Sequence, residues 1–487
     1  MNLHWSKSLG VAFLLWSSGA GWACETVEST EEVVPDGVVG QSVFDTDSRE
    51  LTNTSEPANE AGLHGGFEDL AEQMEAALWR QVEPAYAAAY DPAVPGFIET
   101  SPPLRGPHPI RSVVYQARMT WTAAEIARRR PARADRYLSL AQHGLTELHD
   151  RFWDEASGGF FWQRPAPRWP EADASAEAEP TDGPGLLPEK HLYGQAFGIY
   201  AAATVARVAE DPEPALDLAR RAYAWVEGHA ADAEHGGYFE ALTFAGDPIL
   251  TKPDGQKRRN DSLGTAYGFK SMNSHIHLLE AYTALYRVWP DPQLREDFEV
   301  LLQIVHDRIY VEPGGLNMFF TRDWRAVPNG ESFGHDVETA YLMTDAAEAL
   351  GEPWPERVAA RARRLVDHAL EWGYDQDHGG FYEHGRAFRP PYLLDKIWWV
   401  QAEGFNALAL MHATYGHETD RYAEALRRTW DFTARHVIDA ETGRWHPQTH
   451  RDSEPMQEGF RPGSHEDIYH SGRAMLETAD RLRELEP

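Results

Sequence analysis

A turn motif recurs six times along the chain, and it constrains the fold more than any other feature of the sequence. Each copy combines acidic residues with glycine and then, in most copies, an aromatic or apolar residue, as in Asp-Glu-Ala-Ser-Gly-Gly-Phe at 154–160. Glycine permits the positive φ that a tight turn needs, so such a pattern can recur. The copies lie at 91–97, 154–160, 232–238, 312–316, 375–381 and 439–444.

The segments between the turns show the 3.6-residue periodicity of helices, as in the apolar positions 278, 279, 282, 285 and 286. Each interval is long enough for two helices and a short loop. Helical hairpins that need a neighbour to cover their apolar faces can close into a ring or stack as an open solenoid. We expect the ring, an all-α (α/α)6 toroid with short β and turn elements at its loop face; the open solenoid is the alternative.

Composition is consistent with one large folded domain and argues against some partners. The 487 residues are 42% hydrophobic and 11% aromatic, and the formal net charge is -32. Such a field repels phosphate backbones, so nucleic acid is not an expected partner, whereas neutral sugars remain open. The single cysteine, Cys24, excludes an intrachain disulfide framework and a cysteine-rich metal site.

The first residues have the layout of a secretory signal peptide. The apolar run Leu9–Trp16 is too short to span a bilayer stably and is followed by small residues. We therefore expect residues 1–23 to direct export to the cell envelope or periplasm. Cys24 resembles a bacterial lipoprotein acylation site and is the candidate lipid anchor. Gly21 replaces the usual leucine three residues earlier, so ordinary signal-peptidase cleavage is the alternative.

The remainder divides by composition into a tether and a domain. Residues 24–65 are acidic and polar with few large apolar side chains, which predicts a disordered tether. Residues 66–487 are expected to form the toroid as a monomer or homodimer. The stretch at about 164–189, rich in proline, alanine and acidic residues, is expected to be a surface insert.

Two stretches place a histidine three residues before a glutamate, at His277/Glu280 and His335/Glu338. At this spacing both side chains share a helical face. A carboxylate beside an imidazole fixes its tautomer and raises its pKa, which suits a general acid or base. An ordinary ion pair at the surface or core edge is the alternative for either pair. Joint metal ligation is a lesser alternative, and we expect no metal site.

Further polar and aromatic residues stand in apolar helical stretches. Trp399 and Glu403 are one helical turn apart, Arg118 lies in an aromatic run, and His470 lies close to Arg473. Each alone could serve packing, a cation–π contact or an interior salt bridge. Their joint occurrence in one register of a six-hairpin ring favours a functional site.

Six segments resemble the signature blocks of the N-acylglucosamine 2-epimerase superfamily, and most closely its cellobiose 2-epimerase branch. They include Lys-Ser-Met-Asn at 270–273, Ser-Phe-Gly-His-Asp-Val-Glu at 332–338 and Trp-Trp-Val-Gln-Ala-Glu at 398–403. The blocks are in family order and extend over nearly the whole folded region. The matching segments are 116–121, 190–197, 270–282, 332–338, 398–403 and 469–473.

The resemblance implies an enzyme that binds the open-chain form of a reducing sugar in the funnel of the toroid. One histidine removes the C2 proton to leave a cis-enediolate, and a second returns a proton to the opposite face after rotation about C2–C3. His335 and His470 match these acid/base histidines, and Glu338 is expected to tune His335. No redox or metal cofactor is expected.

The same resemblance implies roles in binding. His277 and Arg118 match residues that bind the carbonyl oxygen and stabilise the enediolate charge. Trp399 and Glu403 match a pair that stacks on the sugar and hydrogen-bonds to it. Further substrate contacts are expected at Asn273, Phe197, Tyr341 and His465. The family's epimerase branch usually has tryptophan at the last two positions, which leaves the preferred sugar open.

These features together predict an isomerase-class enzyme, an aldose 2-epimerase acting on a glucose or mannose unit at the reducing end of a mono- or disaccharide. An aldose–ketose isomerase of the mannose-to-fructose type is the alternative within the family. A glycoside hydrolase on the same toroid would use Glu338 and Glu403 as its paired carboxylates. A non-catalytic sugar-binding envelope protein would keep Trp399 and lose the histidines.

Overall fold

The computed structural model describes residues 66–99, 110–166, 189–253, 259–328, 330–452 and 467–485. The expected signal peptide and tether, Cys24, His465 and most of the insert at 164–189 lie outside the described residues, so they stay predictions. No helix in the described ranges is long and apolar enough to cross a bilayer.

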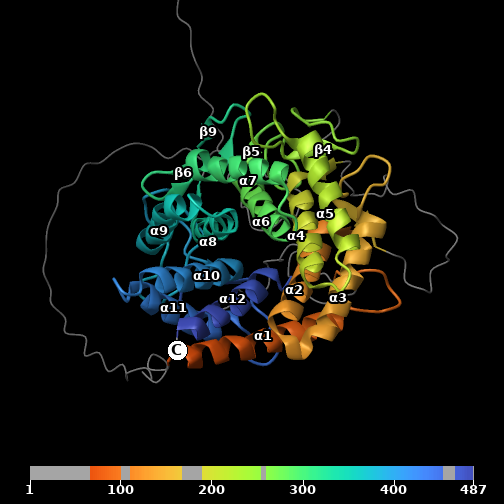
Figure 1. Cartoon of the computed structure of the whole chain (residues 1–487). Helices are drawn as coiled ribbons and strands as arrows, with labels where there is room; N and C mark the ends of the chain where they lie inside the picture. Colours follow the sequence, from red (N-terminus) through yellow and green to blue (C-terminus); the bar gives the residue numbers. More distant parts are fainter. Residues whose placement is uncertain are drawn as a thin grey trace, which may run out of the picture.

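The helices α1 to α12 form six hairpins that close into a ring (Figure 1). Colours that follow the sequence run once around the ring, and α12 packs against both α1 and α2, which closes it. The predicted (α/α)6 toroid is therefore confirmed, and the open solenoid is wrong. The inner helices are α2 (Val113–Arg129), α4 (Leu192–Val208), α6 (Met272–Val288), α8 (Phe333–Leu350), α10 (Trp398–Tyr415) and α12 (Tyr469–Leu485). The outer helices are α1 (Phe67–Ala89), α3 (Ala134–Glu147), α5 (Glu213–Trp225), α7 (Pro292–Ile304), α9 (Trp354–Trp372) and α11 (Arg421–Phe432).

Inner and outer helices differ in how they are buried. Every residue of α2 from Val113 to Ala127 is buried, whereas α7 buries a single face that includes Leu294, Phe298 and Leu301. A helix covered on all sides cannot leave polar groups without partners at low cost. Polar side chains on the inner helices are therefore held in defined contacts, and these helices carry the candidate site.

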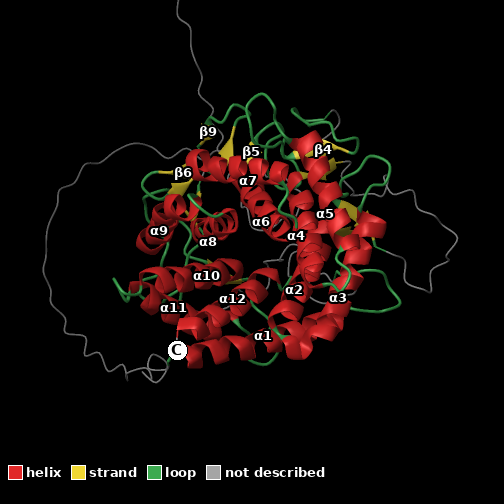
Figure 2. Cartoon of the chain, in the orientation of Figure 1, coloured by secondary structure: helices red, strands yellow, loops and turns green. Residues whose placement is uncertain are grey.

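Short strands occupy the connections between helices (Figure 2). Five of the inner helices, α2, α4, α6, α8 and α10, follow directly on a strand, and that strand pairs antiparallel with one in a later connection. The pairs are β1 (Ile110–Ser112) with β2 (Gln163–Pro165), β3 (Glu189–His191) with β4 (Ala241–Thr243), β10 (Glu331–Ser332) with β11 (His384–Gly385), and β12 (Lys396–Ile397) with β13 (Gln448–Thr449). The strands β5 (Lys270–Ser271), β8 (Phe319–Phe320) and β9 (Ala326–Val327) form a three-stranded sheet, and β6 (Tyr310–Val311) pairs with β7 (Gly315–Leu316).

A buried lysine pins the repeated turn to the strand before an inner helix. Lys270 Nζ lies 2.9 Å from an Asp232 carboxylate oxygen and donates to the carbonyl oxygen of Gly236. The other oxygen of Asp232 accepts backbone N–H groups within the turn. This arrangement explains why aspartate and glycine recur together in the motif. The same contact joins Lys190 to Asp154 and Lys396 to Asp375.

A glutamine on the inner helix makes a second attachment to the turn. The Gln401 side-chain amide accepts from the backbone N–H of Phe381 at 2.8 Å and donates to its carbonyl at 2.7 Å. Both backbone groups of the turn are thereby satisfied although they are buried. The equivalent pairs are Gln195 with Phe160 and Gln116 with Phe97.

The predicted positive φ occurs in five of the six turns. Gly96, Gly159, Gly237, Gly380 and Gly443 have φ between 65° and 82°. The fourth copy was predicted to behave alike, and that expectation is wrong. Its glycine at 315 belongs to the extended strand β7, so the turn there is built without a left-handed residue.

Alanine substitutions in the third turn should separate conformational strain from steric clash. Gly236 has φ +74° and open space where a Cβ would lie, whereas at Gly237 (φ +72°) a Cβ would lie 2.4 Å from the Trp324 ring. We expect Gly236→Ala to lower the free energy of unfolding by about 1 kcal/mol and Gly237→Ala to lower it by more. Gly228→Ala is the control, since Gly228 has neither feature. Urea unfolding gives the order, and equal losses at 236 and 237 would contradict the steric argument.

Candidate active site

The candidate site is formed by the N-terminal ends of the inner helices. His335 is the third residue of α8, Trp399 the second of α10 and His470 the second of α12. The paired strand β10 precedes α8, and the lysine and glutamine contacts described above fix the start of α10. The site therefore lies at the end of the ring where strands join the inner helices.

One indole ring lies close to both histidines. The Trp399 ring centroid is 5.0 Å from that of His335 and 5.6 Å from that of His470. Both imidazoles are largely buried, with 6% and 7% of their surface exposed. The structure thus brings together the two histidines that the sequence singled out, with a flat apolar surface shared between them.

Each of these histidines is held through Nδ1 by a different group. His470 Nδ1 lies 2.7 Å from Glu403 Oε1. His335 Nδ1 lies 2.5 Å from Ser332 Oγ, and this hydroxyl donates to Glu383 at 2.7 Å. A hydroxyl that donates to Glu383 accepts the Nδ1–H of His335, which leaves Nε2 as the basic nitrogen. The anchoring through Nδ1 is what lets Nε2 face a substrate.

Burial keeps both imidazoles neutral near pH 7. Burial lowers the pKa of His335 to about 3, with a smaller contribution from the neighbouring His277. Burial likewise lowers the pKa of His470 well below its usual value, and the positive charges of Arg118 and Arg473 act in the same direction. Neutral imidazoles can accept a proton, so both are suited to act as bases.

The Arg473 guanidinium binds carboxylates from three other inner helices. It lies 2.8 Å from Glu338 on α8 and 2.7 Å from Glu403 on α10, and it donates to Glu280 on α6. Arg473 has no exposed surface. The pKa values of two of these carboxylates shift in opposite directions. Burial raises the pKa of Glu403 to about 7, whereas at Glu280 Arg473 and His277 outweigh burial and lower the pKa to about 2.

The structure corrects the partner expected for His335. Glu338 was predicted to tune this histidine, but its Oε1 bonds Arg473 and lies 4.0 Å from His277 Nε2 and 4.0 Å from His470 Nδ1. Ser332 takes the position next to His335 Nδ1 instead. His335 and Glu338 are three residues apart and share a helical face, but the Glu338 carboxylate bonds Arg473 of α12 instead.

Glu403 also has a contact that the sequence did not predict. It was expected to bind the sugar, and in the structure Oε1 is shared between His470 Nδ1 and Arg473. Its Oε2 is buried without a hydrogen-bond partner in the described part of the chain. Glu403 therefore orients His470, and a direct contact with the sugar stays a prediction.

His277 and Asn273 lie on α6 beside the two histidines. The predicted pairing of His277 with Glu280 is confirmed, because Nδ1 and Oε2 are 2.9 Å apart. The Asn273 side-chain amide lies 3.3 Å from His335 Nε2, and its NH2 group donates to this basic nitrogen once the amide is turned over. Both side chains thus face the region where a substrate would meet His335.

Arg118 is held in a cage of polar and aromatic groups. Its guanidinium donates to Asp467 and to the Tyr193 hydroxyl, each at 3.0 Å. It also lies 4.5 Å from the ring centroid of Phe197, and that ring lies 4.9 Å from the ring of His277. Phe197 therefore contacts both Arg118 and His277, and this contact helps to fix where the positive charge lies.

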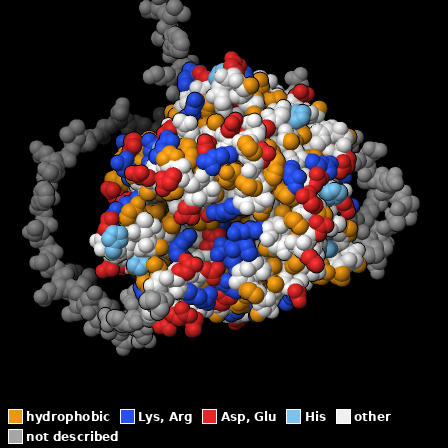
Figure 3. Space-filling view, in the orientation of Figure 1, with side chains coloured by type: hydrophobic (Ala, Val, Ile, Leu, Met, Phe, Trp, Pro, Cys, Tyr) orange, Lys and Arg blue, Asp and Glu red, His pale blue; other side chains and the backbone are white. Residues whose placement is uncertain are grey.

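Tyr341 lies at a second hollow of the ring. It lines a cavity at the C-terminal half of the inner helices, with Arg473 Cζ 5.6 Å from its ring. Charged side chains line the same cavity, among them Arg128, Arg287 and Asp345. Basic and acidic side chains are visible in the hollow at the centre of the ring (Figure 3). The expected contact of Tyr341 with the sugar stays a prediction.

Several residues of the site were not singled out by sequence reasoning, namely Ser332, Glu383, Tyr193 and Asp467. The turn repeat could have predicted the role of Glu383. Glu383 follows its repeat glycine by three residues, as Glu240 follows Gly237. Glu240 accepts from two serine hydroxyls at the start of α6, just as Glu383 accepts from the serine at the start of α8. Aligning the repeats would have predicted this contact.

Three site residues could in principle bind a cation. Among the described residues, Glu338, Glu403 and His470 have potential ligand atoms within 4.8 Å of one another. A metal ion there would compete with Arg473, which already bonds both carboxylates. The donor set is therefore better suited to a guanidinium than to a metal ion.

Residues 104–474 match the family model of N-acylglucosamine 2-epimerase (GlcNAc 2-epimerase). The chain belongs to this family. A cellobiose 2-epimerase of Bacteroides fragilis is 29% identical over 384 residues, which is 76% of this chain and 88% of that one. A solved cellobiose 2-epimerase from Spirochaeta thermophila superposes with a TM-score of 0.71 at 29% identity, covering 86% of this chain and 98% of that one. A D-mannose isomerase of Marinomonas mediterranea is 22% identical, covering 64% and 72%.

This chain is therefore an enzyme of the isomerase class, namely a sugar epimerase or isomerase. The resemblance predicted from the signature blocks is confirmed by the family match and by similarity to cellobiose 2-epimerases.

Replacing Arg473 should destabilise the ring more than replacing a surface arginine of the same helix. Arg473→Met leaves three buried carboxylates without their cation, which should lower the free energy of unfolding by about 3–5 kcal/mol. Arg483→Met is the matched control, because Arg483 pairs at the half-exposed surface with Glu75 and should cost less than about 1 kcal/mol. Denaturant unfolding measures both, and similar losses would show that the buried cluster adds no stability.

Proposed function

We propose that this enzyme epimerises C2 of an aldose, the reducing-end glucose or mannose unit of a mono- or disaccharide. The observation that carries this proposal is the placement of His335 and His470 beside one tryptophan ring, each tied through Nδ1. Inversion at one carbon requires a base on each face of that carbon. The names of the similar cellobiose 2-epimerases support the choice of reaction.

In the proposed reaction the open-chain sugar stacks on Trp399. One histidine removes the C2 proton and leaves a cis-enediolate. The protonated histidine passes this proton to an enediolate oxygen and is neutral again. Rotation about C2–C3 presents the opposite face of C2 to the other histidine, which takes the proton from that oxygen and returns it to C2. Because either imidazole starts neutral, the one that accepts the proton depends on which epimer is bound.

Charge develops on the sugar oxygens as the proton leaves. Arg118 carries a fixed positive charge whose position is set by Asp467 and Phe197, and His277 is oriented by Glu280. Groups oriented before the reaction stabilise such charge without reorganising. We assign Arg118 and His277 to the carbonyl and enediolate oxygens, with Asn273 as a further contact.

An aldose–ketose isomerase is the second candidate, and the similarity to a D-mannose isomerase favours it. It would use the same enediolate and deliver the proton to C1. The hydrolase alternative has less support. Glu338 and Glu403 bond the same guanidinium nitrogen and lie within 4.8 Å of each other, so no sugar bond fits between them.

Incubation with reducing sugars in D2O, followed by NMR, distinguishes these reactions. We expect an epimer that carries deuterium at C2 when the substrate is glucose, mannose or cellobiose. A ketose product would establish the isomerase instead, and shortened glycans would establish a hydrolase. His335→Ala and His470→Ala should each reduce epimer formation by at least about 100-fold. His417→Ala is the control, because this exposed histidine lies on the outside, and circular dichroism verifies folding of each variant.

The lowered pKa values predict an unusual pH dependence. A base with a lowered pKa stays deprotonated until the pH falls below that pKa. We therefore expect kcat/KM to be nearly constant from pH 8 to pH 6 and to decline only at lower pH, well under the value of about 6.5 for free histidine. A decline centred at pH 6.5 would contradict the neutral, buried state of both imidazoles.

We also propose that the protein is exported and anchored to the cell envelope by lipid at Cys24. The support is the apolar run followed by small residues and a lone cysteine at the start of the chain. Membrane fractionation of cells producing the full chain or its Cys24→Ala variant tests the anchor.

A further inference from the structure

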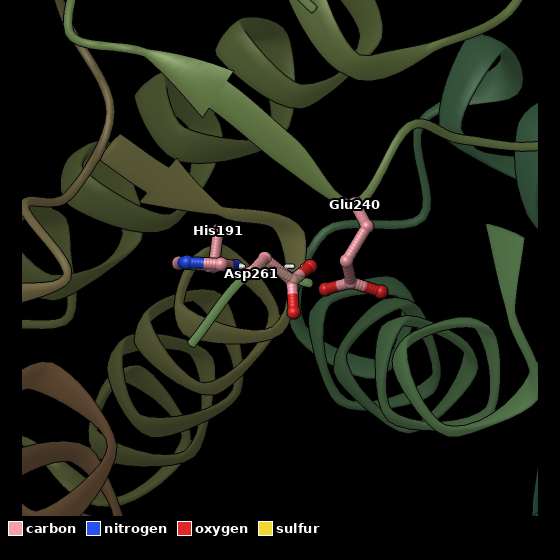
Figure 4. Close-up of side chains that lie close together, drawn as sticks. All are labelled: His191, Glu240 and Asp261. Atoms are coloured by element: carbon pink, nitrogen blue, oxygen red, sulfur yellow. Dashed lines mark ion pairs between the residues drawn. The ribbon is translucent and has the colours of Figure 1, made fainter. Parts of the chain in front are cut away.

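A second cluster of buried acidic and imidazole groups lies outside the proposed catalytic residues (Figure 4). His191 ends strand β3, Glu240 directly precedes β4, and Asp261 lies in the connection that leads to β5. All three are almost fully buried, with at most 4% of their surface exposed. Their potential ligand atoms lie within 4.8 Å of one another.

Two atoms of this cluster face each other without a hydrogen-bond partner. His191 Nδ1 and Asp261 Oδ2 are 4.0 Å apart, which is too far for a hydrogen bond, and neither has another partner in the described part of the chain. Asp261 Oδ1 is fully used, because it accepts the backbone N–H groups of Leu263 and Thr265. Buried polar atoms are nearly always satisfied, so this gap points to a bound group.

The other ring nitrogen of His191 shows which atom is free to bind. Nε2 lies 3.0 Å from Glu189 Oε1 and 2.7 Å from Ser262 Oγ. The second oxygen of Glu189 accepts from the Tyr267 hydroxyl, so this carboxylate is itself held in place. Histidines that bind metals commonly donate their remaining N–H to such a carboxylate. With the proton on Nε2, the Nδ1 lone pair points toward Asp261.

The charges of the cluster also favour a cation. Glu189, Glu240 and Asp261 surround one imidazole, and across the described ranges the ion pairs of Glu189 and Asp261 are with His191. Glu240 is oriented by the hydroxyls of Ser271 and Ser274, which carry no charge. Buried carboxylates without sufficient positive charge are costly, and metal binding is one way to offset the cost.

We propose that His191 Nδ1, Asp261 Oδ2 and a carboxylate oxygen of Glu240 bind a divalent transition-metal ion such as Zn²⁺. One imidazole nitrogen with two carboxylate oxygens suits zinc better than magnesium or calcium. Zn–N and Zn–O bonds are about 2.0–2.2 Å long, so the 4.0 Å gap admits such an ion, and small rotations of the side chains complete its geometry.

This ion has a structural role, because the cluster is closed to solvent and takes no part in the proposed reaction. It joins strand β3, which leads into α4, to the turn before β4 and to the connection before α6. These segments position Phe197 on α4 and Asn273 and His277 on α6. The ion would therefore stabilise one wall of the site.

Calorimetric titration of the chelator-treated full chain with ZnCl₂, combined with anomalous diffraction from zinc-soaked crystals, tests the proposal. We expect an anomalous peak between His191 and Asp261, and a higher melting temperature when zinc is added. Asp261→Asn should lose this binding equivalent and the rise in melting temperature.

Asp336→Asn is the matched control, because Asp336 belongs to a similar buried cluster in which its carboxylate already bonds His368 at 2.8 Å. It should keep the zinc bound at His191. Absence of the anomalous peak in wild-type crystals overturns the proposal even if Asp261→Asn does not fold, and it would assign the gap to water or a proton. Sugar turnover by the metal-free protein is expected to persist, which separates this result from a failure of the proposed function.

Discussion

The buried ion cluster around Arg473 is the constraint on which the site depends. The guanidinium comes from α12, and its three carboxylates come from α6, α8 and α10, so the contacts exist only when the ring has closed. Separating these charges from water is costly, and the cost is offset only when every partner is present. One of the carboxylates, Glu403, also orients His470. The contacts that hold the inner helices together therefore also orient His470, one of the two proposed bases.

A second constraint acts at the N-terminal ends of the inner helices. Lys396 and Gln401 attach the turn at 375–381 to the start of α10, and this start carries Trp399. The two histidines have reached a similar orientation through different groups. One is held directly by a carboxylate, and the other by a serine that leads to Glu383. This asymmetry gives the two bases different surroundings although they face one indole.

The fold could be predicted from the sequence because its repeat is local, with glycine and aspartate marking each turn. The pairing of His277 with Glu280 could be predicted for the same reason, since both lie on one helix. His335 and Glu338 have identical spacing, yet Glu338 bonds an arginine 135 positions away. Spacing indicates which residues share a face, but it does not indicate which distant residue competes for them. Tyr341 stands six residues after His335 on α8, and its ring lies beside Arg473 and the second cavity, a neighbourhood that spacing alone did not indicate.

The same ion cluster separates the two ends of the ring. Arg473 is completely buried where α6, α8, α10 and α12 meet, with His470 and Trp399 at the N-terminal ends of their helices and Tyr341 in the cavity at the other end. The buried cluster thus lies between the proposed site and the cavity at the other end of the inner helices. In the proposed reaction, a sugar that binds beside Trp399 enters and leaves at the same end of the ring, so the residues that border this entrance govern both binding and release.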